Sequence, residues 1–217
     1  MKARRAKGDG GTGEGGYALI ALLALMTVLM ITMMAAAPSI RQQSRREQEL
    51  EAIARGEEVA EAIRMYVRYK GGAPNSLPTS MEELLEGVTP AGSTKKVKVL
   101  RASAARDPLS ESGEWRTIKP RDEAMVRFIR DITEYAEGRT PNQTDDGALK
   151  AVAGQLPQIT GLVTGLGSDD RDEGGEDSSL SSNGPFVGVA SRSRRESIVT
   201  YYGIERHDRW VFTPFFR

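Results

Sequence analysis

The sequence predicts an α+β protein in which a long amino-terminal membrane-spanning helix packs on a small antiparallel β-sheet. The first observation is an uncharged apolar run at residues 17–37, and the second is a stretch rich in helix formers that follows it as far as Lys70. The third is a set of short β-branched and aromatic segments close to the carboxyl end. The chain has 217 residues, so one modest domain remains outside the apolar run.

Composition excludes several kinds of function. The chain has no cysteine, which excludes disulfides, thiol nucleophiles and cysteine-ligated metals. It has a single histidine, His207, so no histidine pair can hold zinc. Thirty basic and thirty acidic residues give a net charge of zero, and composition therefore predicts no attraction to nucleic acid.

The apolar run is long enough to cross a membrane. A helix needs about 20 apolar residues for this, and residues 17–37 supply 21. A cleaved signal peptide, with an apolar core of about 7 to 15 residues, is the alternative, and AAAP at 35–38 resembles its cleavage site. Four basic residues precede the run and favour a cytoplasmic amino terminus, although arginines also follow it. The basic residues are Lys2, Arg4, Arg5 and Lys7 before the run and Arg41, Arg45 and Arg46 after it.

The junction before the run resembles the processing signal of type IV pilins and of the pseudopilins of type II secretion. A basic, glycine-containing leader ends at Gly16, and Tyr17 and ALIALLALMTV follow. The resemblance implies that a prepilin peptidase removes residues 1–16 and that the new amino group of Tyr17 is methylated. It also implies a single-pass protein of the bacterial inner membrane, with a periplasmic carboxy-terminal domain. The implied partners are other subunits, the assembly platform and lipid. The glycine-rich 11–16 stretch is expected to lie extended in the peptidase.

Two positions in the run refine this resemblance. Pro38 lies where family members often carry a helix-kinking proline, although a proline that simply ends a membrane helix is the alternative. Ala21 stands where most members carry a glutamate that pairs with a neighbour's amino terminus. The missing carboxylate puts a role as the major, self-repeating subunit in doubt.

Residues 38–70 are predicted to continue the helix outside the membrane, ending at Gly71 and Gly72. Apolar residues at spacings of three and four form one stripe, interrupted at Gly56 and Glu57. The stripe, expected to pack on the sheet, is Leu50, Ile53, Val59, Ala60, Ile63, Tyr66 and Val67. The charged face opposite is expected to be solvated.

The globular domain is predicted to occupy 71–217. Ser80 and Glu83 form a capping box before a short helix, and 95–100 alternates as a strand does. A turn is expected at Asp107 and Pro108, and a second strand about Trp115 and Ile118. This order resembles the pseudopilin globular domain.

Residues 121–138 are predicted to form an inserted amphipathic helix, followed by a flexible segment at 139–184. The apolar face of the helix is Met125, Phe128, Ile129, Ile132 and Tyr135. Weak candidates for calcium ligands in the flexible segment are Asp169, Asp170, Asp172 and Glu173. Their spacing does not match the twelve-residue helix-loop-helix template, so a solvated acidic loop is preferred and no cofactor is expected.

Three strands are predicted at the end of the chain, near 186–190, 197–202 and 210–213. This tail is similar to that of a bacterial group of pseudopilin-like proteins, with the pattern GP(I/F)VGVASKS, SI…YNG and W(V/L)F. The matching residues are Gly184, Pro185, Phe186, Val187, Gly188, Val189, Ala190, Ser191, Ser197, Ile198, Tyr201, Gly203, Trp210, Val211 and Phe212. Residues 121–183 lie outside the resemblance.

Catalysis is not expected. His207 beside Asp208 raises the hypothesis of a hydrolase, but no G-x-S-x-G motif is present and adjacency alone assembles no triad. Arg192, Arg194 and Arg195 fit an acidic partner or a phosphate, or an ordinary turn between strands. The predicted function is a non-enzymatic structural subunit of a pseudopilus or pilus. The rivals are an unprocessed single-span protein that binds a ligand or the cell wall, and an exported hydrolase.

Overall fold

The computed structural model describes residues 14–73, 75–138, 145–154, 156 and 184–216. Within this range, the side chains of residues 14, 15 and 34–41 are not described. The chain divides into two compact units, Met1–Arg45 and Arg46–Arg217. Helix α1 (Glu14–Tyr69) belongs to both, so its two parts are described separately.

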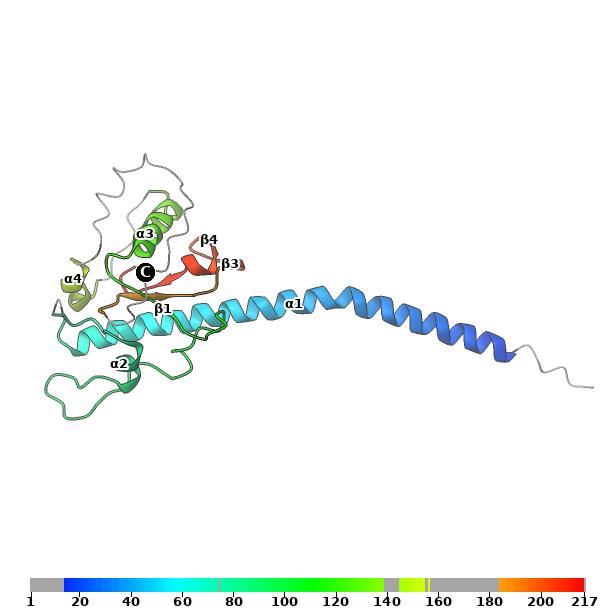
Figure 1. The fold of residues 1–217 in the computed structure, drawn as a ribbon, viewed down its shortest axis with the longest axis horizontal. Helices are drawn as coiled ribbons and strands as arrows, with labels where there is room; N and C mark the ends of the chain where they lie inside the picture. Colours follow the sequence, from blue (N-terminus) through cyan, green and yellow to red (C-terminus); the bar gives the residue numbers. More distant parts are fainter. Residues whose placement is uncertain (1–13, 74, 139–144, 155, 157–183, 217) are drawn as a thin grey trace, which may run out of the picture. The chain divides into compact units, whose positions relative to one another are not determined.

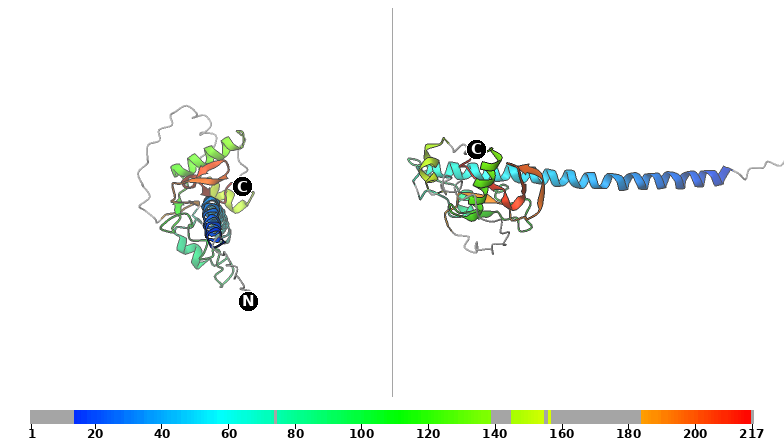
Figure 2. Two further views of the ribbon diagram at one scale, coloured as in Figure 1. Left: turned by 90° about the vertical axis from the view of Figure 1, so that its right-hand side faces the viewer. Right: turned by 90° about the horizontal axis from the view of Figure 1, so that it is seen from above.

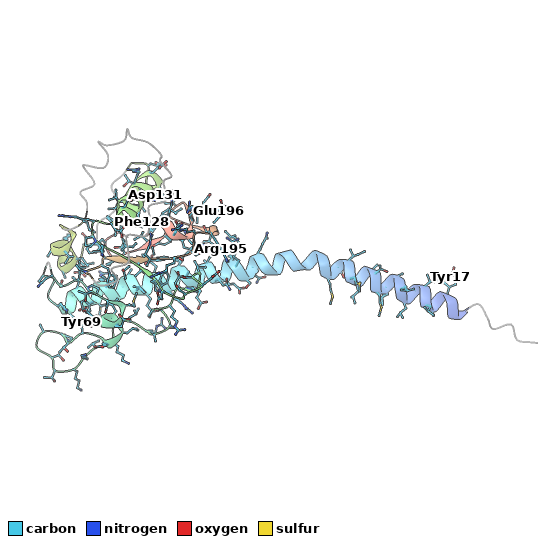
Figure 3. All side chains as sticks on the ribbon, viewed as in Figure 1. Tyr17, Tyr69, Phe128, Asp131, Arg195 and Glu196 are labelled. Atoms are coloured by element: carbon cyan, nitrogen blue, oxygen red, sulfur yellow. The ribbon has the colours of Figure 1, made fainter. Side chains whose placement is uncertain are left out.

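The first part of α1 is apolar and exposed. All side chains described between Gly16 and Met33 are exposed, and this stretch is long and apolar enough to cross a membrane by length and composition. Figure 3 shows its side chains, including Tyr17, projecting from the helix. The hydroxyl of Thr32 donates to the Leu29 carbonyl oxygen at 2.8 Å, and the hydroxyl of Thr27 donates to that of Leu23. The helix thus satisfies its own polar groups, as a helix in hydrocarbon must.

Two expectations concern this first part. The helix begins at Glu14, so Gly16 lies within its first turn, and the extended conformation expected in the peptidase stays a prediction. Residues 11–13 lie outside the described range. The helix assignment continues through Pro38, whose side chain is not described, so the kink stays a prediction.

The second unit is layered. A three-stranded antiparallel sheet has the order β1 (Arg116–Ile118), β2 (Gly188–Ala190) and β5 (Val211–Phe212). The register places Thr117 opposite Val189, and Val189 opposite Phe212. In Figures 1 and 2 this sheet lies between the second part of α1 and helix α3 (Glu123–Tyr135). The predicted strands near 118, 186–190 and 210–213 are therefore confirmed.

A second sheet pairs β3 (Glu196–Tyr201) with β4 (Ile204–Arg206). The hairpin turns through Tyr202 and Gly203, with φ of +50° and +76°, which is the two-residue turn whose twist matches paired strands. A tyrosine rarely adopts positive φ, and here its ring packs edge-on against Phe128 and Tyr135 of α3. The sequence predicted β3 but not β4.

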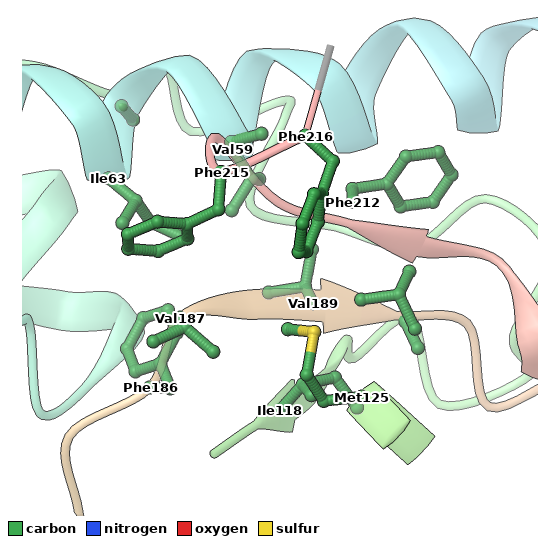
Figure 4. Packing of buried hydrophobic residues seen from close by; sticks show 14 of the residues in the cluster. Val59, Ile63, Ile118, Met125, Phe186, Val187, Val189, Phe212, Phe215 and Phe216 are labelled. Atoms are coloured by element: carbon green, nitrogen blue, oxygen red, sulfur yellow. The ribbon is translucent and has the colours of Figure 1, made fainter. Parts of the chain in front are cut away.

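The core fills the space between α1 and the sheet. Figure 4 shows Val59 and Ile63 of α1 facing Phe212 and Phe215, and all four side chains are buried. Gly56 explains the gap in the predicted stripe, because a Cβ there would lie 2.3 Å from ring atoms of Phe212. The Phe212 ring therefore packs directly on the helix backbone at Gly56, where there is no side chain.

Each of the short helices α2 (Met81–Glu86) and α4 (Gly147–Ala153) begins directly after a residue whose side chain caps its amino terminus. Helix α2 begins after Ser80, whose hydroxyl accepts a hydrogen bond from the Glu83 amide at 3.4 Å. The Glu83 carboxylate accepts from the amide of Thr79, one residue before the position a capping box requires. Helix α4, capped by Asp146, was not predicted and lies in the segment expected to be flexible.

Three detailed predictions are wrong. Residues 95–100 form no strand; they make one isolated bridge, Val88 to Val97, because no second strand extends the pairing. Leu50 is 48% exposed and Tyr135 is 63% exposed, so neither belongs to its predicted buried face. The buried face of α1 continues through Gly56, Ala52 and Glu49. None of these three residues has a large apolar side chain, so the apolar spacing does not reveal them.

Candidate functional site

Three polar side chains of the second unit are joined by hydrogen bonds, and we call them the polar link. They are Glu49, His207 and Ser193. Glu49 is fully buried on α1, and His207 is 1% exposed in the 3₁₀ turn η1 (His207–Arg209). The Nε2 atom of His207 lies 3.1 Å from Oε1 of Glu49, and its Nδ1 lies 3.2 Å from Oγ of Ser193. Residues about 150 positions apart in the sequence thus share one hydrogen-bonded chain.

The Glu49 carboxylate also fills a bulge in β3. Between the pairs Glu196–Arg206 and Tyr201–Ile204, four residues of β3 stand opposite one residue of β4. A bulge leaves backbone groups without ladder partners. The amides of Ile198 and Val199 both donate to Oε2 of Glu49 at 2.8 Å. A side chain from a helix therefore replaces the missing strand partner, and it satisfies two backbone donors.

The surroundings of His207 fix its ring. The neutral tautomer with its proton on Nε2 donates to Glu49 and leaves Nδ1 to accept from the Ser193 hydroxyl, so every group is satisfied. The Trp210 ring meets the imidazole edge-on, with centroids 4.9 Å apart. The His207 amide donates to the Arg195 carbonyl oxygen at 3.2 Å. Ring and backbone are thereby held in one orientation.

A second buried carboxylate positions the loop that carries Ser193. Oδ2 of Asp107, at the predicted turn, accepts from the Ser191 hydroxyl at 2.7 Å and from the Arg192 amide at 3.3 Å. The Ser191 oxygen in turn accepts from the Ser193 amide at 3.1 Å. Residues 191–193 are thus anchored at both ends, by Asp107 and by His207.

A hydroxyl, an imidazole and a carboxylate joined in this order can activate the hydroxyl as a nucleophile. An imidazole that accepts from a hydroxyl and is oriented by a carboxylate can take up the hydroxyl proton as the oxygen attacks an electrophile. Ser193 is half-buried, and Arg192 and Arg194 beside it are exposed cations. Asp208, the neighbour considered in the sequence, does not orient His207; its carboxylate pairs with Arg206 at 3.1 Å.

The residues predicted from the resemblance lie elsewhere. Gly16, Tyr17 and Ala21 are exposed on α1 in the first unit. The calcium candidates Asp169, Asp170, Asp172 and Glu173 lie outside the described residues. Among the residues that are described, no group of three or more His, Asp or Glu side chains is placed to hold a metal ion.

Sequence reasoning missed Glu49 and Ser193. Glu49 sits among other charged residues that read as a solvated face, and Ser193 sits in a basic turn. One signal could have pointed to Glu49, since it continues the phase of Ala52, Gly56 and Val59 on α1. Comparison with known protein families, with curated proteins and with solved structures found no match for this chain.

Proposed function

We propose that this chain is a structural subunit of a type II secretion pseudopilus or a pilus-like filament, cut after Gly16 and assembled through α1. One observation supports this most strongly. Between Tyr17 and Met33 every described side chain of α1 is exposed, whereas the same helix buries Val59 and Ile63 within its own domain.

The exposed apolar part of the helix needs a covering. Lipid provides one before assembly, and helices of sister subunits provide another within a filament. Since lipid is as apolar as leucine, close packing and lipid release drive the exchange, and the gain per helix is small. Ala21 offers no carboxylate for a neighbour's amino terminus, so a tip or minor position suits this subunit better than the repeating core.

The proposed setting follows from the resemblance of the leader. The subunit would lie in the bacterial inner membrane with its amino terminus in the cytoplasm and its second unit in the periplasm. Its partners would be prepilin peptidase, an assembly platform, other subunits and membrane lipid. Filament assembly of this kind requires no chemistry from the chain itself.

Processing is the feature that separates this proposal from its main rival. An unprocessed single-pass periplasmic protein that binds a ligand or the cell wall would also carry an apolar helix. Terminal mass analysis of protein purified from membranes distinguishes the two. The proposal expects a chain that begins at Tyr17 with one added methyl group, and the rival expects one that keeps its leader.

A pair of leader variants makes this test specific. Gly16→Leu places a bulky side chain at the cut and should abolish processing. Gly10→Leu makes the same change away from the cut and should leave processing intact. Wild-type protein that retains residues 1–16 in a host with an active prepilin peptidase would refute the proposal.

A further inference from the structure

We propose that Ser193 is an activated nucleophile that accepts an acyl group from small, negatively charged activated esters. His207 would act as its general base, and Glu49 would position the imidazole. This inference is independent of filament assembly, because it rests only on the polar link inside the second unit.

The geometry meets two requirements for an activated serine. The hydroxyl must reach a base, and the base must be oriented by a third group. Ser193 Oγ is 3.2 Å from Nδ1, and Glu49 is 3.1 Å from Nε2. The two bulge amides, each 2.8 Å from the carboxylate, keep Glu49 itself from turning away.

Other serines of the same region lack this arrangement. Ser191 donates its hydroxyl to Asp107, a carboxylate without an intervening imidazole. Ser112 is exposed and lies 2.9 Å from Ser110, another hydroxyl. Since the chain has a single histidine, only one serine can be served in this way, and it is Ser193 that contacts the ring.

Charge around Ser193 indicates the class of substrate. Arg192, Arg194 and Arg195 flank it, and all three are exposed. Arg192 is 3.6 Å from Glu114 and Arg195 is 3.7 Å from Glu111, both exposed pairs of the kind that contribute little and exchange easily. These guanidinium groups can turn to an anionic ester and stabilise the oxyanion that forms on it.

The chemical step needs no co-reactant beyond the ester and water. Ser193 Oγ attacks the acyl carbon while its proton passes to Nδ1 of His207. The bond from carbon to the alcohol breaks, and the alcohol leaves with that proton. Water then cleaves the acyl-serine by the same route and restores the hydroxyl.

A fluorophosphonate probe tests this on the full-length protein in detergent. Attack by Ser193 forms an oxygen–phosphorus bond and releases fluoride with the serine proton, and peptide mass spectrometry locates the label. We expect native protein to label at Ser193 roughly a hundredfold faster than at Ser112, with a rate that follows the deprotonation of one group as pH rises. Ser193→Ala should lose this label, and His207→Gln should lose both the fast rate and its pH dependence. Equal labelling of Ser193 and Ser112 in native protein would refute the proposal.

A thiol variant keeps the test decisive if His207→Gln does not fold. The chain has no cysteine, so Ser193→Cys introduces a single thiol, and Ser112→Cys provides the matched control. An imidazole partner favours the thiolate, so we expect alkylation at neutral pH to be at least about tenfold faster at position 193. Equal or slower alkylation there would show that His207 does not act as a base, and would overturn the proposal.

Discussion

The two parts of α1 both carry apolar side chains, but these side chains have opposite environments. From Tyr17 to Met33 all are exposed, and from Ala52 to Val67 most are buried, with Val59 and Ile63 facing Phe212 and Phe215. The second part is buried within its own unit, whereas the described side chains of the first part are exposed. One continuous helix thus contributes to a buried core in one part and presents an exposed apolar surface in the other. Substitutions should therefore affect the two parts differently.

The largest effect is expected at Glu49, the first fully buried residue of the second part. Glu49→Ala leaves the amides of Ile198 and Val199 and the His207 ring without their acceptor, and should lower the free energy of unfolding by about 3–5 kcal/mol. Denaturant unfolding in detergent, followed by tryptophan fluorescence, measures this, since Trp210 contacts His207. Exposed Glu51, whose ion pair with Arg55 lies at the surface, is the control, and Glu51→Ala should change stability by about 0.5 kcal/mol or less. Similar small losses for both variants would show that Glu49 does not hold the bulge.

Shortening one apolar side chain in each part of α1 should change the stability of the second unit by very different amounts. Ile63→Ala removes buried contacts and should cost about 2–5 kcal/mol. Leu25→Ala, at an exposed position, should leave the denaturant midpoint of the second unit unchanged. If Leu25→Ala destabilised the second unit as much as Ile63→Ala, the contrast between the two parts would fail.

Gly56→Ala sets helix propensity against packing. Alanine favours a helix by about 0.5–1 kcal/mol over glycine, but its Cβ would meet the Phe212 ring. Overpacking typically costs about 1–3 kcal/mol, so we expect a net loss near 1 kcal/mol in thermal or denaturant unfolding. In a Phe212→Leu background the ring is gone, and the same substitution should turn neutral or stabilising. If Gly56→Ala stabilised the protein in the wild-type background, the close packing of the Phe212 ring on Gly56 would be refuted.

The smallest effect concerns the contact of α1 with α2. Burial raises the pKa of Glu83, but hydrogen bonds from Thr79 and Tyr66 outweigh it and leave that pKa below its ordinary value of 4.5. Burial, followed by the same Glu83 contact, raises the pKa of the Tyr66 hydroxyl. A lowered carboxyl pKa contributes stability above pH 4.5 that is lost as pH falls below it. Glu83→Gln should therefore cost about 0.5 kcal/mol at pH 7, and its difference from wild type should vanish in acid. A difference independent of pH would refute this account.

Sequence patterns predicted the elements that depend on local spacing. The buried face of α3, the Ser80 cap and the stripe at Val59 to Val67 follow from periods of three and four. The strand predicted at 95–100 failed because alternation says nothing about whether a partner strand exists, and only Val97 found one.

The polar link could not be predicted for a related reason. A single glutamate in a charged helix is ordinarily solvated, and the burial of Glu49 depends on donors at 198, 199 and 207 that only the fold brings near. The membrane-length helix was predictable from composition alone, whereas processing at Gly16 rests on resemblance and stays a prediction.

The bulge filled by Glu49 has a mechanical consequence. The hairpin of β3 and β4 is tied to α1 at the bulge through Glu49 and again through the hydrogen bond from Tyr201 to Glu57, two turns further along the helix. Tension applied along this part of α1 would load both ties, because they join the same helix to the same hairpin. Helix and hairpin would therefore resist a pull together, because neither tie could yield without loading the other.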